Sequence, residues 1–308
     1  MADIVVSEFL DDAALARLAA YEVHYDPDPV DHPEDLIEAC RGARGLIVRN
    51  RTKVTRALLE AAPKLEVVGR LGVGLDQIDL PACAEHDVTV CPASGANALA
   101  VAEYVIGSIF HLSRLSLSNT PAVLAGAWPR TKTREWEVAG RTLGIIGFGH
   151  IGRMTAGLAR GLGMRIIACD PFLDDHDPAW TEGERRDLPA LLAEADTVSL
   201  HVPLTDSTRG MIGAAEIDQM KTTAFLINTA RGGVVDNEAV ATRLRDGKLG
   251  GAALDVFEGE PLSAEQAFPL RDAPNLILTP HIAGLTDEAL DRVSTMTVSN
   301  VLRVLESN

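Results

Sequence analysis

Residues 142–171 limit the possible folds of this chain more than any other stretch. They comprise an apolar run, three glycines, an amphipathic stretch and a second apolar run that ends at Asp170. Gly147, Gly149 and Gly152 have the spacing G-x-G-x-x-G. This order is typical of a strand, a tight turn, a helix and a strand that hold the pyrophosphate of a dinucleotide at the helix N-terminus. The alternative interpretation is a glycine turn that serves only packing.

Each part of the motif has its own task in a dinucleotide site. The first glycine permits the tight turn, the second lets the backbone approach the pyrophosphate, and the third lets the helix pack on the strand. Asp170 would accept hydrogen bonds from the ribose hydroxyls and repel a 2′-phosphate. The sequence therefore predicts NAD, rather than NADP, as the cofactor.

Short apolar runs alternate with helical patterns on both sides of this motif. Before it, strand-like runs lie at residues 3–9, 45–50, 65–72 and 87–92, with helix-like stretches at 11–20, 33–41, 53–62 and 76–86. From the motif onward, strand-like runs lie at 142–149, 165–170, 197–203, 223–229, 251–257 and 276–281. Strands joined through helices pair in parallel, because parallel neighbours require crossover connections. We therefore predict an α/β fold of two doubly wound parallel-sheet domains, a Rossmann-type cofactor domain and a flavodoxin-like substrate domain.

A long helical pattern at residues 286–307 is expected to return to the first domain and make it discontinuous. The predicted substrate domain comprises residues 1–93 and 284–308, and the predicted NAD-binding domain comprises residues 94–283. The two chain crossings between them are expected near 93–95 and 283–286. Hinged domains of this kind close on their cofactor.

Composition and charge exclude several classes of protein. The 308 residues carry a formal net charge of −16, which disfavours binding to nucleic acid and to acidic membrane surfaces. No apolar stretch reaches the roughly 20 residues of a membrane span, and the chain does not begin like a secretory signal, so we expect a cytoplasmic protein. The four cysteines lack CxxC spacing, which favours reduced thiols over a disulfide framework or a metal site. A small anionic substrate then requires a local cluster of basic side chains.

Three polar residues follow apolar strands in the second half of the chain. Arg231 follows one strand, Glu260 precedes Pro261 in a turn, and His281 follows another strand. Hydride exchange between a nicotinamide and a hydroxyl carbon needs a group that exchanges the hydroxyl proton and a cation that holds a carboxylate. A carboxylate beside the imidazole would favour its charged form. Taken singly, each residue could instead be a strand cap, a solvated acid or a core histidine.

Seven segments together resemble the D-2-hydroxyacid dehydrogenase family, especially its D-3-phosphoglycerate dehydrogenase-like branch. They are VGRLGVGLDQID, NALAVAEYVIG, GFGHIGR, VSLHVPLTDSTRGMI, INTARGGVVD, ALDVFEGEP and PHIAG. The resemblance implies catalysis by Arg231, Glu260 and His281 in a cleft between the domains, and a homodimer formed through the cofactor domains. Gln77 departs from the family's usual Asn but leaves the neighbouring glycines intact.

The resemblance also implies a set of contacts for each ligand. The substrate carboxylate is expected on the backbone N–H groups of Gly72, Val73 and Gly74, assisted by Arg231. His281 is also expected to contact the substrate. The nicotinamide amide is expected on Asp255. The cofactor contacts implied in full are Gly147, Gly149, His150, Ile151, Gly152, Asp170, His201, Pro203, Thr208, Thr229, Ala230, Arg231, Asp255 and His281.

Arg49 and Arg51 follow an apolar strand of the substrate domain in an otherwise acidic chain. They are either surface cations or a grip on a second anionic group of the substrate, as in the phosphoglycerate dehydrogenase-like branch. The second interpretation predicts a substrate of the 3-phosphoglycerate or 3-sulfolactate class, with a glyoxylate or hydroxypyruvate (glycerate) reductase as the alternative. A formate dehydrogenase is disfavoured because Glu260 stands where that enzyme has Gln. An NAD-sensing corepressor-like binding protein is the alternative that is not an enzyme.

Overall fold

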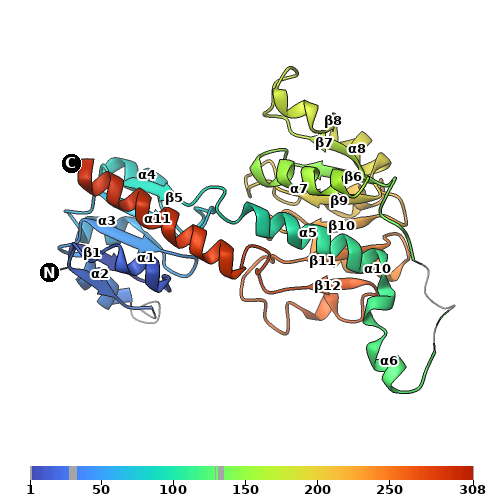
Figure 1. Ribbon diagram of the computed structural model, residues 1–308, viewed down its shortest axis with the longest axis horizontal. Coiled ribbons are helices and arrows are strands. Elements are labelled where there is room, and N and C mark those ends of the chain that lie inside the picture. The colour runs from blue at the N-terminus through green and yellow to red at the C-terminus, as the bar shows by residue number, and fades with distance from the viewer. Residues whose placement is uncertain (1, 28–32, 129, 131–134, 308) are drawn as a thin grey trace. The chain divides into compact units, whose positions relative to one another are not determined.

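The computed structural model describes residues 2–27, 33–128, 130 and 135–307, and the chain divides into two compact units (Figure 1). The first unit comprises Met1–Asn97 and Leu285–Asn308, and the second comprises Ala98–Gly284. The first crossing lies a few residues after the expected 93–95, because Ala93 and Ala96 are buried in the core of the first unit.

The first unit is built on a five-stranded sheet whose strands are all parallel. Its strands are β1 (Ile4–Val6), β2 (Val23–Tyr25), β3 (Gly45–Val48), β4 (Val67–Arg70) and β5 (Thr89–Pro92). Their order in the sheet is β2-β1-β3-β4-β5. This is the flavodoxin-like doubly wound order, so the predicted fold of this unit is confirmed.

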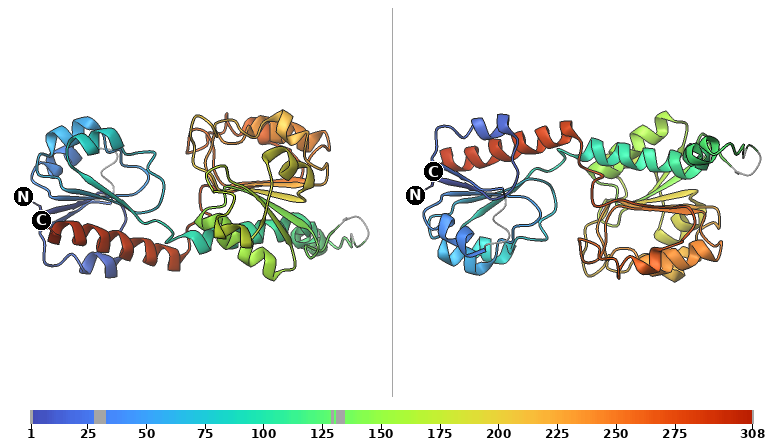
Figure 2. Two further views of the ribbon diagram at one scale, coloured as in Figure 1. Left: turned by 90° about the horizontal axis from the view of Figure 1, so that it is seen from above. Right: turned by 90° about the horizontal axis from the view of Figure 1, so that it is seen from below.

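Helices cover both faces of the first sheet, which Figure 2 shows from two sides. One layer consists of α2 (Pro33–Cys40), α3 (Arg56–Ala61) and α4 (Leu80–Glu85), and the other of α1 (Asp12–Ala16) and α11 (Asp287–Ser307). The last helix packs closely because β4 carries a glycine at the contact. A Cβ at Gly69 would lie 2.5 Å from Val301 and 2.9 Å from Thr297.

The second unit contains a seven-stranded parallel sheet. Its strands are β6 (Thr142–Ile146), β7 (Arg165–Cys169), β8 (Glu184–Arg185), β9 (Thr197–Leu200), β10 (Phe225–Asn228), β11 (Gly251–Leu254) and β12 (Leu276–Leu278). The order β12-β11-β10-β9-β6-β7-β8 reverses direction between β6 and β9. This is the Rossmann-type order with one further strand, as predicted.

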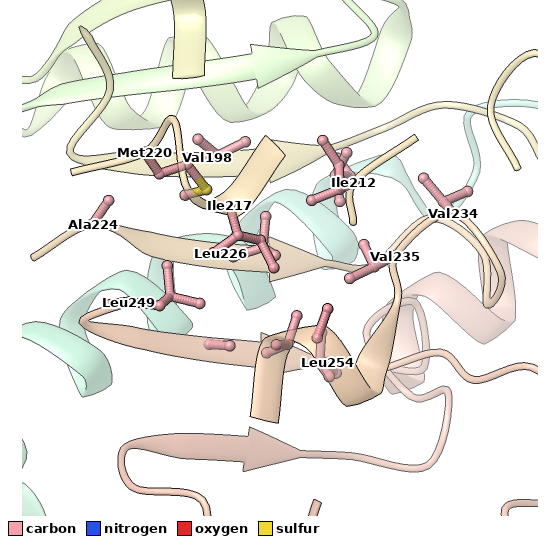
Figure 3. Close-up of a cluster of buried hydrophobic side chains, with 14 of the residues drawn as sticks. Val198, Ile212, Ile217, Met220, Ala224, Leu226, Val234, Val235, Leu249 and Leu254 are labelled. Atoms are coloured by element: carbon pink, nitrogen blue, oxygen red, sulfur yellow. The ribbon is translucent and has the colours of Figure 1, made fainter. Parts of the chain in front are cut away.

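Helices also cover both faces of the second sheet. One face carries α5 (Ala98–Ser113) and α7 (His150–Gly161), and the other carries α8 (Leu188–Glu194), α9 (Ala214–Ile217) and α10 (Asn237–Arg245). A short helix, α6 (Thr120–Leu124), follows α5. Figure 3 shows part of the buried cluster on the second of these faces, which includes Val198, Ile212, Ile217, Met220, Ala224, Leu226, Val234, Val235, Leu249 and Leu254. Side chains of β9, β10 and β11 and of α9 meet in this cluster.

Two strands were not predicted from the sequence, so the expected strand count was too low in each unit. β2 has three residues and β8 has two, and each pairs along one side only, at a sheet edge. None of their residues is buried. Without an apolar run there is no local pattern to mark an edge strand.

The described residues contain no helix that is long and apolar enough to cross a membrane. Within the same ranges, no group of three or more His, Cys, Asp or Glu side chains is arranged to hold a metal ion. The four cysteines are free thiols.

Candidate active site

The predicted cofactor residues of the second unit follow the carboxyl ends of neighbouring strands. His281 follows β12, Asp255 follows β11, Arg231 follows β10, His201 follows β9, and Asp170 follows β7. Because these strands are parallel and adjacent, all of these residues lie along one edge of one sheet. In open α/β sheets this edge binds ligands at the point where the strand order reverses.

The glycine turn between β6 and α7 leaves space where a dinucleotide needs it. A Cβ at Gly147, whose φ is +88°, would lie 2.6 Å from the carbonyl oxygen of His201. A Cβ at Gly152 would lie 2.3 Å from the carbonyl oxygen of Gly147. At Gly149 a Cβ would meet nothing within 4 Å. The first and third glycines are therefore required by packing, and the open side at Gly149 fits an approaching pyrophosphate.

Asp170 lies beside this turn, half-buried at the end of β7. Its Oδ2 accepts the N–H of Phe148 at 2.8 Å, and its Oδ1 accepts the N–H of Phe172 at 3.0 Å. These bonds hold the carboxylate at the turn, and each oxygen keeps a lone pair for a ribose hydroxyl. His150 and Ile151 form the first turn of α7, where no side chain caps the backbone N–H groups.

The remaining predicted cofactor residues lie after β9 and β10. The His201 ring contacts Ser199 at 3.0 Å, and burial lowers its pKa to about 4, so the imidazole is neutral. Thr208 donates to the carbonyl of Pro203 at 2.6 Å and closes that turn. The Thr229 hydroxyl is buried and has no hydrogen-bond partner among the described residues. Such an unpaired polar atom fits a site that a polar cofactor completes.

Arg231 is positioned by the turn that follows β10. The fully buried Asn228 side chain accepts the N–H of Ala230 at 3.0 Å and donates to the carbonyl of Arg231 at 3.0 Å. The Arg231 guanidinium donates to the carbonyl of Ala230 at 2.6 Å. The next residue, Gly232, passes so close to the chain that a Cβ would lie 2.0 Å from the Phe257 carbonyl. Arg231 is thereby brought beside the turn that carries Glu260, whose carboxylate it influences electrostatically.

Glu260 and His281 form a close pair. Glu260 Oε2 lies 2.6 Å from His281 Nδ1, and Glu260 Oε1 accepts the N–H of Phe257 at 2.9 Å. Burial raises the pKa of the Glu260 carboxyl, but the hydrogen bonds from His281 and Phe257, with the charges of His281 and Arg231, hold the pKa below its ordinary value. An ionised Glu260 at Nδ1 leaves Nε2 of the imidazole to exchange a proton with a ligand.

The backbone at His281 is held in a left-handed conformation, with φ +56°. The carbonyl of Asp255 accepts the His281 N–H at 2.8 Å. The Asp255 carboxylate, 1% exposed, accepts the N–H groups of Ile282 at 2.8 Å and Ala283 at 2.9 Å and the hydroxyl of Thr279 at 2.6 Å. A non-glycine residue persists in this region only where its surroundings fix it, and Asp255 supplies that constraint.

A hydroxyl on α5 extends this network. The Tyr104 hydroxyl lies 2.5 Å from Thr279 Oγ1. The hydrogen of Thr279 is directed to Asp255, so Tyr104 is the donor. Burial raises the pKa of Tyr104, which keeps the phenol protonated.

Sequence patterns did not identify Asn228, Thr279 or Tyr104. Asn228 is the last residue of β10 and Thr279 follows β12, so their places at strand ends could have drawn attention to them. Tyr104 lies inside a helix, 175 positions from its partner Thr279. No local pattern connects two such residues.

In the first unit, the predicted substrate residues also gather at one sheet edge. Gly72, Val73 and Gly74 follow β4, and Arg49 and Arg51 follow the neighbouring β3. Gly72 has φ +142°, and Val73 is 38% exposed at the tip of its loop.

The Arg70 side chain fills the inside of the Gly72–Gly74 loop. It donates to the carbonyl of Gly74 at 2.7 Å and to that of Leu71 at 2.5 Å. A Cβ at Gly72 would overlap the Arg70 guanidinium. Because two loop carbonyls bind Arg70, the loop is held in one conformation.

Arg49 and Arg51 differ in their surroundings. Arg49 is half-buried and Arg51 is exposed. Burial lowers the pKa of Arg49, and the charge of Glu8 offsets this only in part. Within the described ranges, no hydrogen bond or ion pair joins the Arg49 guanidinium to another side chain. A partly desolvated cation of this kind is suited to an anionic ligand.

Residues 106–283 match the family model of the D-isomer specific 2-hydroxyacid dehydrogenase, NAD binding domain. The chain belongs to the D-isomer specific 2-hydroxyacid dehydrogenase family. The matched residues lie inside the second unit and include every predicted cofactor contact. The predicted resemblance and the NAD cofactor are confirmed.

Relatives of this dehydrogenase act on anionic hydroxy acids. It is 51% identical to the (S)-sulfolactate dehydrogenase of Chromohalobacter salexigens over 99% of each chain. It is 42% identical to the D-3-phosphoglycerate dehydrogenase of Haemophilus influenzae over 84% of this chain and 63% of that protein. The structure of D-lactate dehydrogenase from Aquifex aeolicus, complexed with NAD and lactic acid, matches with a TM-score of 0.84 and 29% identity over 99% of this chain and 96% of that one.

These similarities establish the reaction class of the dehydrogenase. It is an NAD-dependent oxidoreductase of anionic 2-hydroxy acids. The prediction of an enzyme is therefore confirmed over that of a corepressor-like binding protein.

Replacing Glu260 with Gln is expected to change the pH dependence of this dehydrogenase. The Glu260 carboxylate lies 2.6 Å from Nδ1 of His281, the predicted proton donor to a keto acid, and a negative charge there stabilises a positive charge on the ring. The glutamine side chain carries no charge, so in the variant this side chain no longer stabilises a positive charge on the ring. The alkaline limit of keto-acid reduction should therefore move to lower pH, and so should the acid limit of hydroxy-acid oxidation. The measurement is kcat/KM against pH in both directions, and an unchanged reduction profile would remove Glu260 from this role.

Replacing Asp170 with Ala is expected to relax the choice of cofactor. The change removes the predicted ribose acceptor and the predicted repulsion of a 2′-phosphate. We expect a loss of roughly 10- to 150-fold in kcat/KM for NAD, as for one or more charge-assisted hydrogen bonds, with a smaller loss or a gain for NADP. Initial rates with both cofactors measure the ratio. Equal use of NAD and NADP by the unmodified enzyme would show that another group dominates this pocket.

Proposed function

We propose that the enzyme oxidises (S)-3-sulfolactate, a 2-hydroxy acid with a distal sulfonate, to its 2-keto acid. The observation that carries this proposal is Arg49, a half-buried guanidinium without a side-chain partner in the described part of the chain, beside the Gly72–Gly74 loop. A sulfonate offers three oxygens to a guanidinium. The 51% identity to an (S)-sulfolactate dehydrogenase over the full chain supports the choice of sulfonate.

The S descriptor agrees with the D-isomer preference of the family. In lactate and glycerate the carboxyl carbon outranks C3, and the D isomer is R. In sulfolactate the sulfur on C3 makes that carbon outrank the carboxyl carbon. The same spatial arrangement of the four groups is then named S.

We assign the following roles to the residues of this chain. The N–H groups of Gly72, Val73 and Gly74 hold the substrate carboxylate, and Arg231 grips it and polarises the 2-carbonyl. His281 Nε2 takes the hydroxyl proton in oxidation and returns it in reduction, with Glu260 as its charged partner. When bound, NAD accepts the hydride from C2. The first unit is thus the substrate domain and the second the NAD-binding domain.

The cofactor contacts follow from the same edge of the second sheet. The glycine turn and the first turn of α7 receive the pyrophosphate, and Asp170 receives the ribose. The resemblance pairs Asp255 with the nicotinamide amide, and both of its carboxylate oxygens accept hydrogen bonds from the loop of His281. Asp255 therefore holds that loop in place. Its Oδ2 also keeps a lone pair that can accept a hydrogen bond from the amide.

A substrate panel tests the proposed function. We expect the highest kcat/KM for (S)-3-sulfolactate, ahead of D-3-phosphoglycerate, D-glycerate and D-lactate, all with NAD. A preference for D-3-phosphoglycerate would show that the distal anion of the substrate is a phosphate rather than a sulfonate. Equal rates on all four substrates would contradict a distal anion site.

Replacing Arg49 with Ala tests the proposed contact of its guanidinium with the sulfonate. Losing one charge-assisted contact should lower kcat/KM for sulfolactate roughly 10- to 150-fold and leave D-lactate oxidation nearly unchanged. Arg51→Ala should have a smaller effect, because contacts of an exposed guanidinium are weakened by water. Equal losses on both substrates in the Arg49 variant would contradict the proposed contact.

We further propose that the enzyme is a homodimer formed through the second unit. Near α6, Leu117, Leu124 and Trp128 are 64%, 83% and 76% exposed, and Figure 1 shows α6 extending from the body of this unit. Exposed apolar side chains gathered in this way mark an interaction surface. Sedimentation equilibrium should give twice the chain mass, and a monomer would contradict the proposal.

We also propose a cytoplasmic location, because the free thiols fit a reducing compartment. Cell fractionation would test this location.

A further inference from the structure

The first unit has its own point of strand-order reversal, between β1 and β3. β1 pairs with β2 on one side and β3 on the other. The loop after β1 carries Glu8, and the loop after β3 comprises residues 49–52. Ligands of doubly wound sheets bind at this point, outside the carboxyl ends of the strands.

Here a carboxylate of the protein itself occupies that point. Glu8 is 4% exposed, and its two oxygens accept the N–H groups of four successive residues. The distances are 2.8 Å from Arg49, 3.3 Å from Asn50, 3.2 Å from Arg51 to each oxygen, and 3.0 Å from Thr52. Successive N–H groups that converge on one anion form a nest. The nest of residues 49–52 is filled by Glu8.

A second bond joins the same two loops. The Ser7 hydroxyl lies 3.0 Å from that of Thr52, and both residues are buried. A buried carboxylate is tolerated only when it is well hydrogen-bonded. The four N–H groups meet that demand, and in return the carboxylate determines the backbone conformation at the base of Arg49 and Arg51.

This arrangement has a consequence for anion binding by the loop. The N–H groups of residues 49–52 are directed at Glu8, so they are not available to an anion of the substrate. The loop can hold a distal anion only through its side chains, of which Arg49 is half-buried. The position of that guanidinium depends on the backbone that Glu8 holds.

We propose that Glu8 is a specificity-determining positioning residue, which holds the loop of residues 49–52 so that Arg49 meets the distal anion of the substrate. This inference rests on the proposed function. Glu8 itself does not contact the substrate. Its removal should therefore act on substrates that carry a distal anion and spare those that lack one.

The test compares Glu8→Gln with the control Glu60→Gln, an exposed residue on α3. A Gln side chain has one acceptor oxygen in place of two and turns an NH2 group toward the loop N–H groups. We expect kcat/KM for (S)-3-sulfolactate to fall roughly 10- to 150-fold, through KM, with D-lactate kinetics unchanged. Amide hydrogen exchange at residues 49–52 should become faster in Glu8→Gln and stay unchanged in Glu60→Gln.

A purely structural role of Glu8 would give a different pattern. Equal losses on sulfolactate and lactate, or unchanged exchange at residues 49–52, would overturn the proposal. If Glu8→Gln does not fold, Glu8→Asp takes its place. That variant keeps the charge but withdraws the carboxylate by one methylene, and the same selective loss is expected.

Failure of the proposed function has a separate signature. It appears in the unmodified enzyme, as a preference for a substrate without a distal anion, or in Arg49→Ala, as equal losses on sulfolactate and lactate. Failure of the Glu8 proposal appears when both of those results are as expected and only the Glu8 variants lack selectivity.

Discussion

His281→Asn is expected to lower kcat about 100- to 10,000-fold in both directions, the range for loss of a general acid–base group. The amide cannot exchange a proton with the substrate hydroxyl. Asn is the sharpest replacement because it tolerates the left-handed backbone better than most residues, and His281 has φ +56°. The loop should therefore keep its bonds to Asp255. Steady-state rates with NAD and hydroxy acid, and with NADH and keto acid, measure the effect.

Two measurements accompany this variant. The thermal unfolding midpoint should match that of the unmodified enzyme, which separates lost chemistry from lost structure. His24→Asn, on the exposed edge strand β2, should leave kcat unchanged. A His281→Asn enzyme that kept most of its turnover would show that another group transfers the proton.

Arg231→Lys should lower kcat/KM roughly 10- to 150-fold, the range for one charge-assisted hydrogen bond. The charge is retained, but an ammonium cannot reproduce the planar two-point contact of a guanidinium with a carboxylate. Lys would also lose the hydrogen bond that Arg231 makes to the Ala230 carbonyl. The loss should be similar for all 2-hydroxy acids, because all of them carry the carboxylate.

Arg243→Lys is the matched control. Arg243 lies on α10 and pairs with Asp218 at 2.7 Å, away from the predicted site residues. The same exchange of side chain there should leave kcat/KM unchanged. An Arg231→Lys enzyme with normal kcat and normal KM would show that Arg231 does not grip the substrate.

The fold class and the cofactor turn are readable in the sequence because their signals are local. Buried parallel strands are continuous apolar runs, and the glycines at 147 and 152 are required by contacts that a Cβ would violate. The edge strands β2 and β8 lack that signal, since their residues, Val-His-Tyr and Glu-Arg, do not form an apolar run. Their pairing is decided by neighbours that lie elsewhere in the chain.

For the predicted site residues too, the sequence identifies the residues, but only the tertiary structure shows their contacts. Arg231, Glu260 and His281 can be identified as polar residues after apolar strands, because parallel strands bring their carboxyl ends to one edge. The distance of 2.6 Å between Glu260 Oε2 and His281 Nδ1 arises only when their two segments pack together in the tertiary structure. The left-handed backbone of His281 also depends on the tertiary structure, because the Asp255 carboxylate binds the neighbouring N–H group.

The sequence by itself determined the two doubly wound sheets, the dinucleotide turn, the family and the strand ends that carry the predicted site residues. Only the tertiary structure decided which polar groups hold others in place, such as Glu8 on the amide of Arg49, 41 positions away, and Tyr104 on Thr279, 175 positions away. The physical reason is that hydropathy periodicity reports burial over one element at a time. A hydrogen bond between two loops depends instead on distances that arise when separate elements pack.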